Sequence, residues 1–114
     1  MVKNIKVKID KDSTAKSIKC IITVSYTGTF DSVVVNVQIL DSNELIIFKS
    51  YNDKIINQNV SRLFIPAKDI DGIVRVETSL GYIIKESQEI KFRASIIEQH
   101  KEIESDIAFI KIES

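Results

Sequence analysis

The fold is decided by one stretch of sequence, Phe30-Asp31-Ser32-Val33-Val34-Val35-Asn36-Val37-Gln38-Ile39-Leu40. Every second residue from Val33 to Ile39 is β-branched and apolar, so these side chains share one face of an extended chain. In a helix the same residues would spread around the axis and form no apolar stripe. Branching at Cβ also costs rotamer freedom in a helix but packs well on a pleated sheet. We therefore predict a strand over residues 30–40, and we expect it to lie at the centre of a sheet.

The composition of the whole chain favours strands as well. Isoleucine and valine together number 32, against 4 leucines and 4 alanines, in a chain of 114 residues. A chain of this length suits one domain, and it can bury roughly two-thirds of the surface that the unfolded chain exposes. We therefore expect residues 1–114 to form a single domain that needs neither a disulfide nor a metal ion to fold.

Segments of alternating hydrophobicity recur along the chain, separated by turn-forming Asp, Asn, Ser and Gly residues. We predict strands over residues 2–9, 17–26, 30–40, 45–51, 60–65, 73–80, 82–85, 90–96 and 107–112. The first two are expected to form an antiparallel hairpin, and the polar residues 98–105 a loop or one helical turn. Short strands with turns about every 8–12 residues are typical of a sandwich. The predicted fold is therefore all-β, a single antiparallel β-sandwich of about seven to nine strands, immunoglobulin-like or arrestin-like.

No set of residues resembles a catalytic site. His100 is the only histidine, and it lies between Glu98 and Glu102 in a polar stretch. A catalytic histidine needs an oriented partner. We therefore interpret these three residues as charged or polar surface residues rather than as a catalytic site. Cys20 falls on the inward face of its predicted strand, where a cysteine behaves as a small apolar residue. The sequence also contains no glycine-rich phosphate loop and no Cys/His cluster. We therefore predict a protein that is not an enzyme and holds no cofactor.

One turn resembles the beginning of a calcium-binding loop. It reads Asp69-Ile70-Asp71-Gly72, but the fifth and twelfth positions counted from Asp69 are Ile73 and Leu80, which offer no side-chain oxygen. The motif of a helical calcium loop therefore fails. A weak site between loops of the sandwich stays open as an alternative, with the ligands Asp10, Asp12, Asp69 and Asp71.

Charge is balanced overall, with 16 basic and 16 acidic residues, which gives no reason to expect nucleic acid or membrane insertion. Residues 1–19 hold six lysines against two aspartates, and residues 98–114 hold five acids against two lysines. We expect the two ends to lie together with complementary charges; the alternative is a basic arm that binds a partner.

A single cysteine and a charged N-terminal stretch fit a cytoplasmic protein. Richness in Ile, Lys and Glu is compatible with a thermophile.

Partner binding is the function class that remains. Sheet edges expose unpaired backbone groups that accept a strand from another protein, and residues 45–51 and 82–85 are predicted edges. The run Leu45-Ile46-Ile47-Phe48 is apolar on both faces. We predict a partner-binding edge, and the alternative is that the rest of the chain covers it. The partner is expected to be another protein, with a homodimer left open. The predicted binding residues are Leu45, Ile47, Phe48 and Tyr51.

The segment from Val24 to Leu40 resembles an early hairpin of arrestin-like β-sandwich domains, the group that includes retromer subunits. Residues 61–66, Ser-Arg-Leu-Phe-Ile-Pro, fall where such a domain has an inward strand that ends in proline. The resemblance covers roughly the first two-thirds of the chain. It implies a non-enzymatic adaptor or scaffold of archaeal origin, and it transfers no site residues.

A second resemblance is to small heat-shock proteins, which are also β-sandwiches. Residues 62–74 resemble their arginine strand, proline turn and glycine segment, and Ile110-Lys111-Ile112 resembles the C-terminal I-x-I anchor that docks on a neighbouring subunit. This resemblance implies a chaperone or an assembly subunit. It ranks second because about forty residues follow the glycine segment where that family has few, and because the disordered N-terminal arm is missing.

Overall fold

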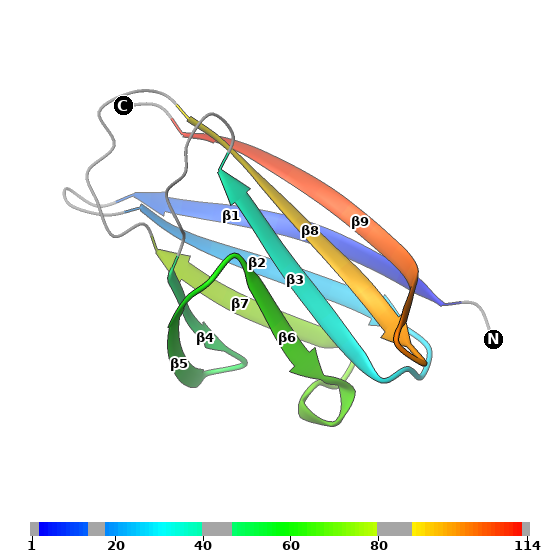
Figure 1. The fold of residues 1–114 in the computed structure, drawn as a ribbon. Coiled ribbons are helices and arrows are strands. Elements are labelled where there is room, and N and C mark those ends of the chain that lie inside the picture. Colours follow the sequence, from blue (N-terminus) through cyan, green and yellow to red (C-terminus); the bar gives the residue numbers. More distant parts are fainter. Residues whose placement is uncertain (1–2, 14–17, 40–46, 80–87, 113–114) are drawn as a thin grey trace.

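The structure is a computed structural model that describes residues 3–13, 18–39, 47–79 and 88–112. These residues form nine β-strands and one short 3₁₀ helix, η1 (Figure 1). The strands are β1 (Asn4–Ser13), β2 (Ile18–Thr27), β3 (Ser32–Ile39), β4 (Ile47–Tyr51), β5 (Lys54–Asn59), β6 (Arg62–Pro66), β7 (Ile73–Ser79), β8 (Gln88–Glu98) and β9 (Lys101–Ile112), and η1 covers Ala67–Asp69 between β6 and β7.

The strands form two antiparallel sheets that pack face to face (Figure 1). The first sheet has the order β1-β2-β7-β4-β5, and the second has the order β6-β3-β8-β9. The predicted all-β sandwich of antiparallel strands is therefore confirmed. Strand β3 lies between β6 and β8, as the alternating stretch at residues 30–40 predicts for a central strand.

One apolar core fills the space between the sheets. The inward side chains are those that the alternation predicts: Val33 and Val35 of β3 are fully buried, and Cys20 is buried in β2. The other buried members come from both sheets: Ile5, Ile22, Val24, Phe30, Phe48, Tyr51, Leu63, Ile65, Val74, Val76, Ile90, Phe92, Ala94 and Ile96. Burial of this much apolar surface is the main driving force for folding a chain without cross-links.

On one side of the sandwich the edge strands β1 and β9 lie next to each other (Figure 1). The backbone N–H of Val7 in β1 donates a hydrogen bond to the Asp106 carboxylate of β9, at 2.8 Å. Lys3 and Glu98 form an ion pair close by. The basic beginning and the acidic end of the chain therefore do lie together, and we call this side the closed side.

On the other side the edge strands are β5 and β6, which follow each other in the chain but belong to different sheets. Among the described strands, β5 pairs only with β4, and β6 pairs only with β3. We call this side the open side. It offers two edges whose outer backbone groups have no strand beside them among the described residues.

The structure corrects the prediction of a sheet edge at residues 45–51. Strand β4 lies inside its sheet and pairs with both β5 and β7. The chain returns at once through Asn52 and Asp53, both in the left-handed region (φ 45° and 65°), and forms β5. This hairpin partner was missed because β5 is mostly polar, and because Asn57 (φ 48°) lies at an irregularity that interrupts its alternation.

Residues 98–105 are likewise a strand rather than a loop or a helical turn. A two-residue turn at Gln99 and His100 (φ 50° and 65°) connects β8 directly to β9. Both residues are left-handed, which matches the twist of a tight hairpin. The first half of β9 was predicted as a loop or a helical turn because it is polar. It is polar because β9 lies at a sheet edge, where many of its side chains face solvent.

Two segments behind the family resemblances also differ from expectation. Strands β1 and β2 form the predicted hairpin, but residues 24–40 do not form one, because β2 and β3 lie in different sheets. The segment Ile110–Ile112 is part of β9 and pairs with β8, and Ile110 packs against the core. A free C-terminal anchor at these residues is therefore contradicted. The predicted edge at residues 82–85 lies outside the described residues.

Candidate functional site

The four residues predicted to bind a partner do not form one accessible surface. Phe48 is 0% exposed and Tyr51 is also buried, and both belong to the core. Ile47 is half-buried on the outer face of its sheet, and Leu45 lies outside the described residues. A partner at this place would reach the neighbouring strand β5 first, because β5 forms the edge of the sheet.

Strand β5 presents an accessible edge with one prominent apolar side chain. Ile55 is 77% exposed and lies opposite Ser50 of β4, whereas Ile56 packs against the core. Beside it, the Lys54 ammonium lies 5.5 Å from the centre of the Tyr51 ring. Its hydrogen bond to Tyr51, together with the Asp69 carboxylate, raises the pKa of Lys54 above its ordinary value. The edge therefore combines free backbone groups, an apolar contact and a stable positive charge.

The outer face of the second sheet carries further apolar residues, but they are scattered. Phe64 of β6 is 59% exposed and lies opposite Val34 of β3, which is only 1% exposed. Phe109 and Ile107 are exposed on β9, at the far side of the same sheet. Lys91 and Arg93 of β8 pair opposite Phe109 and Ile107 and bring charge into this region. The face is therefore mixed rather than one apolar patch.

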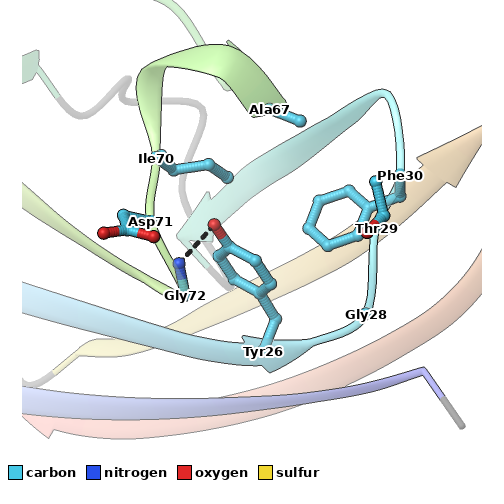
Figure 2. A pocket seen from close by; sticks show the side chains of 8 residues that line it. All are labelled: Tyr26, Gly28, Thr29, Phe30, Ala67, Ile70, Asp71 and Gly72. Atoms are coloured by element: carbon cyan, nitrogen blue, oxygen red, sulfur yellow. Dashed lines mark hydrogen bonds between the residues drawn. The ribbon is translucent and has the colours of Figure 1, made fainter. Parts of the chain in front are cut away.

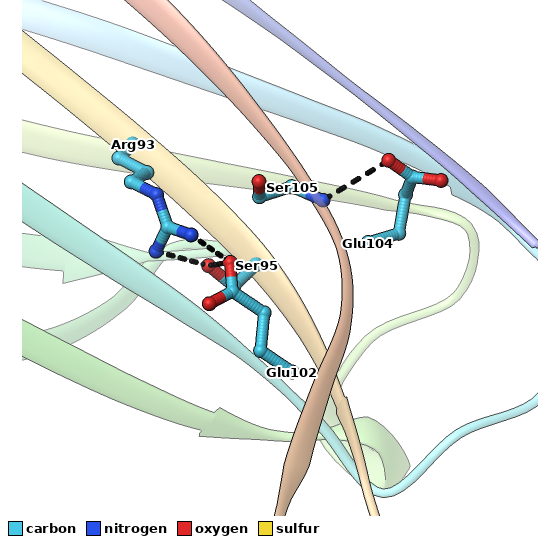
Figure 3. A network of polar contacts seen from close by, with 5 residues as sticks. All are labelled: Arg93, Ser95, Glu102, Glu104 and Ser105. Carbon is cyan, nitrogen blue, oxygen red and sulfur yellow. Dashed lines mark hydrogen bonds and ion pairs between the residues drawn. The ribbon is translucent and has the colours of Figure 1, made fainter.

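A polar network lies on that outer face (Figure 3). Arg93 donates to the Ser95 hydroxyl at 2.8 Å, Ser95 donates to the Glu102 carboxylate at 2.8 Å, and Arg93 forms an ion pair with Glu102. Partial burial raises the pKa of Glu102, but the hydrogen bond from Ser95 and the contact with Arg93 lower it more, so the pKa lies below 4.5. All three groups satisfy one another, which indicates a structural role in joining β8 to β9.

A cavity of about 350 Å³ opens at one end of the sandwich, between the β2–β3 connection and the loop from η1 to β7 (Figure 2). The Tyr26 and Phe30 rings meet edge to face, with centroids 4.7 Å apart. The backbone N–H of Gly72 donates to the Tyr26 hydroxyl oxygen at 2.6 Å, and the N–H of Tyr26 donates to the Gly72 carbonyl at 2.9 Å. The lining residues are Tyr26, Gly28, Thr29, Phe30, Ala67, Ile70, Asp71 and Gly72.

Sequence reasoning missed this cavity, although signals for it exist. Gly28 and Gly72 both have positive φ (105° and 81°), so each sits where the chain needs a residue without a side chain. Two glycines of the three in the chain thus mark the two connections that form the cavity. Their meeting in space depends on the sheet order, which the sequence does not reveal.

The residues considered for catalysis are not brought together. His100 is exposed in the turn between β8 and β9, while Glu98 pairs with Lys3 and Glu102 pairs with Arg93. Cys20 is buried in the core, as predicted. The described residues therefore show no oriented partner for the histidine.

The alternative calcium site is not assembled either. Asp10 lies in β1 in register with Ile21 and, through β2, with Glu77. Asp71 precedes β7, so it lies at least four residues along the strand direction from the level of Glu77 and Asp10. This separates Asp71 from Asp10 by more than roughly 13 Å. Ligands of one calcium ion lie within about 2.6 Å of it, so Asp10 and Asp71 do not share an ion. The side chain of Asp12 is not among those that the structure describes. The described residues contain no group of three or more potential metal ligands.

Comparisons with known proteins leave the family open. No family model matches the chain, and no curated protein matches it. Among solved structures, it is similar to the GAE domain of GGA2p from Saccharomyces cerevisiae, at 12% identity and a TM-score of 0.44, over 96% of this chain and 89% of that one. It is also similar to the yeast GGA1 GAE domain, at 12% identity and a TM-score of 0.40, over 96% and 90% of the two chains. These likenesses are too distant to assign a function.

No helix long and apolar enough to cross a membrane is found in the part of the chain that the structure describes.

Proposed function

We propose that this protein is a non-enzymatic interaction module that binds an extended segment of another protein along β5. The observation that carries the proposal is that β4 is the only described strand that pairs with β5, while the Ile55 side chain of β5 is 77% exposed. An edge strand with free N–H and C=O groups is a template for an added strand, and an apolar side chain beside it supplies contact area. We place the protein in the cytoplasm, because the buried Cys20 thiol fits a reducing compartment.

The contrast between the two sides of the sandwich supports this proposal. On the closed side, β9 lies beside β1, and Asp106 occupies the N–H of Val7, so an added strand would have to displace both. On the open side, no described strand lies beyond β5. The free edge is therefore a property of one side of the molecule, which gives a partner a defined place to bind.

Of the two open edges, β5 is the better acceptor. Strand β6 has five residues and ends at Pro66, which has no N–H to donate to an added strand. Strand β5 has six residues and no proline. Its irregularity at Asn57 limits regular pairing to the first half of the strand, which is where Ile55 lies.

The test uses peptides selected for binding from a displayed random library, with dissociation constants measured by titration. Replacing Ile55 with lysine should weaken binding by about tenfold, since it removes an apolar contact at the edge and adds a charge. The matched control is Ile73→Lys, because Ile73 is 52% exposed on the same sheet but lies on the interior strand β7. This control should change binding by less than about twofold.

If both variants bind the peptides equally well while keeping the thermal stability of the parent protein, the β5 edge is not the binding site. If no selected peptide binds the parent protein more tightly than its own scrambled sequence does, the proposal that β5 binds an added strand is wrong. We also propose that the chain is a single domain, and we therefore expect the full chain to unfold in a single cooperative transition.

A further inference from the structure

The cavity at the end of the sandwich has an arrangement that the proposed function does not use (Figure 2). Its walls come from two connections far apart in the chain, with Tyr26 and Phe30 on one and Ile70, Asp71 and Gly72 on the other. The volume of about 350 Å³ is comparable with small binding sites. It is open to solvent, so it suits a side chain that enters from a partner better than a small molecule that must be enclosed.

The aromatic wall is fixed in place before any ligand arrives. Tyr26 is tied to Gly72 through both its backbone and its hydroxyl oxygen, and its ring meets Phe30 edge to face. Phe30 is itself part of the core. Because these side chains are already ordered, a ligand would not have to supply the free energy for ordering them.

Among the described residues that line the cavity, the one charged residue is Asp71. Asp71 lines the cavity, is exposed, and forms no ion pair with any residue in the described part of the chain. Asp69 lies two residues before it and accepts a hydrogen bond from the Tyr51 hydroxyl at 3.2 Å. The faces of aromatic rings also attract cations. Both the Asp71 carboxylate and the rings therefore favour a positively charged occupant.

The chain itself shows the same combination beside the cavity. The Lys54 ammonium lies 5.5 Å from the centre of the Tyr51 ring, and the Tyr51 hydroxyl bonds to Asp69. A cation, an aromatic ring and a carboxylate thus come together there. The cavity offers a ring and a carboxylate next to that cluster, in Tyr26 and Asp71, and its described lining contains no lysine or arginine.

We propose that the cavity receives an arginine side chain from a partner polypeptide. The planar guanidinium can stack on an aromatic ring and bind a carboxylate with two donors at once. Its long apolar stem can lie against Ile70 and Ala67 at the cavity wall. A lysine offers the same charge but neither the plane nor the paired donors, so arginine fits this site better.

This inference goes beyond the proposed function, because it concerns a different part of the surface and a specific side chain. It is tested with the capped peptide Gly-Gly-Arg-Gly-Gly and the same peptide carrying citrulline, which is neutral but has almost the same shape as arginine. Binding is followed through the backbone amide signals of Gly28, Phe30, Ile70 and Gly72 in two-dimensional NMR spectra. The arginine peptide should shift these signals saturably and bind about fivefold more tightly than the citrulline peptide. A lysine peptide should fall between the two.

The variant Asp71→Asn should abolish most of the preference for arginine over citrulline. The control Asp10→Asn removes an exposed carboxylate from β1, remote from the cavity, and should leave the preference unchanged. Equal binding of the two peptides, no saturable shift, or an undiminished preference in Asp71→Asn would each overturn the proposal. The variant Ile55→Lys should leave these shifts intact, so failure at the β5 edge and failure at the cavity can be told apart.

Discussion

The Asp106 carboxylate accepts a hydrogen bond from the backbone N–H of Val7, at 2.8 Å, and so occupies an outward-pointing backbone group of an edge strand. Natural sheets block their edges with charged side chains, bulges and prolines. In this protein the carboxylate of β9 does so for β1, with the two strands lying side by side. Strand β5 has no such cover from the described residues. The two sides of the sandwich therefore differ in what they offer to another protein.

Replacing Asp106 with alanine should lower the free energy of unfolding by about 1–2 kcal/mol, because a partly buried N–H loses its acceptor. The matched control is Glu104→Ala in the same strand, since the only bond that the Glu104 carboxylate accepts within the described part of the chain is a local one, from the N–H of Ser105. This control should change the stability by less than about 0.5 kcal/mol. Denaturant unfolding measures both values, and equal losses would show that the contact with Val7 contributes nothing specific.

Replacing Phe48 with alanine should destabilise the protein by about 3–5 kcal/mol, since the side chain is fully buried and its removal leaves a cavity. Ile55→Ala, in the neighbouring edge strand, should cost less than about 0.5 kcal/mol. The comparison tests directly whether β4 belongs to the core and β5 to the surface. A small effect of Phe48→Ala would favour the original expectation that residues 45–51 form an exposed edge.

Glu102 should make the stability of the protein depend on pH in the acid range. Its pKa is lowered below 4.5 in the folded protein, so its contribution is fully present above that pH and is lost as the pH falls through the lower folded value. Because the Glu102 side chain is 37% exposed, we expect a contribution of only about 0.5 kcal/mol. Glu102→Gln should therefore be less stable than the parent near neutral pH and equally stable at the acid end. A constant difference across the range would contradict the assigned pKa shift.

Asn57 should tolerate glycine but not a β-branched residue. Its φ of 48° lies in the left-handed region, where glycine is unstrained and a side chain branched at Cβ costs about 1–2 kcal/mol. We expect Asn57→Gly to keep the parent stability within about 0.5 kcal/mol and Asn57→Val to lose at least about 1 kcal/mol. The same valine at the neighbouring Gln58, which has no positive φ, serves as the control. Equal losses at the two positions would exclude backbone strain as the cause.

The features that follow from local alternation were predictable from the sequence. The β3 stretch, the β1–β2 hairpin and the burial of Cys20 all depend on the period of two, which one strand displays by itself. The interior position of β4 was not predictable, because it depends on the pairing of β4 with β5, a polar strand with an irregular residue at Asn57. The β9 strand was partly missed for a related reason, since its polar first half lies at a sheet edge.

The candidate sites depend on the sheet order, and the sequence does not determine that order. Tyr26 and Gly72 are 46 residues apart and meet only because β2 pairs with β7. The same holds for β5, which becomes an edge only because β4 lies between it and β7. The sequence pattern shows which apolar and charged side chains are available to form a site. The pairing of strands far apart in the chain determines which of these side chains are exposed together.

Amide hydrogen exchange of the β5 backbone, measured with and without a saturating library-selected peptide, shows whether a peptide binds as an added strand at β5. We expect the peptide to slow exchange in residues 54–56 and to leave exchange at β1 and β6 unchanged, because a strand added to β5 would occupy its outward N–H groups. Slowed exchange at β1 or β6, with β5 unaffected, would contradict this expectation.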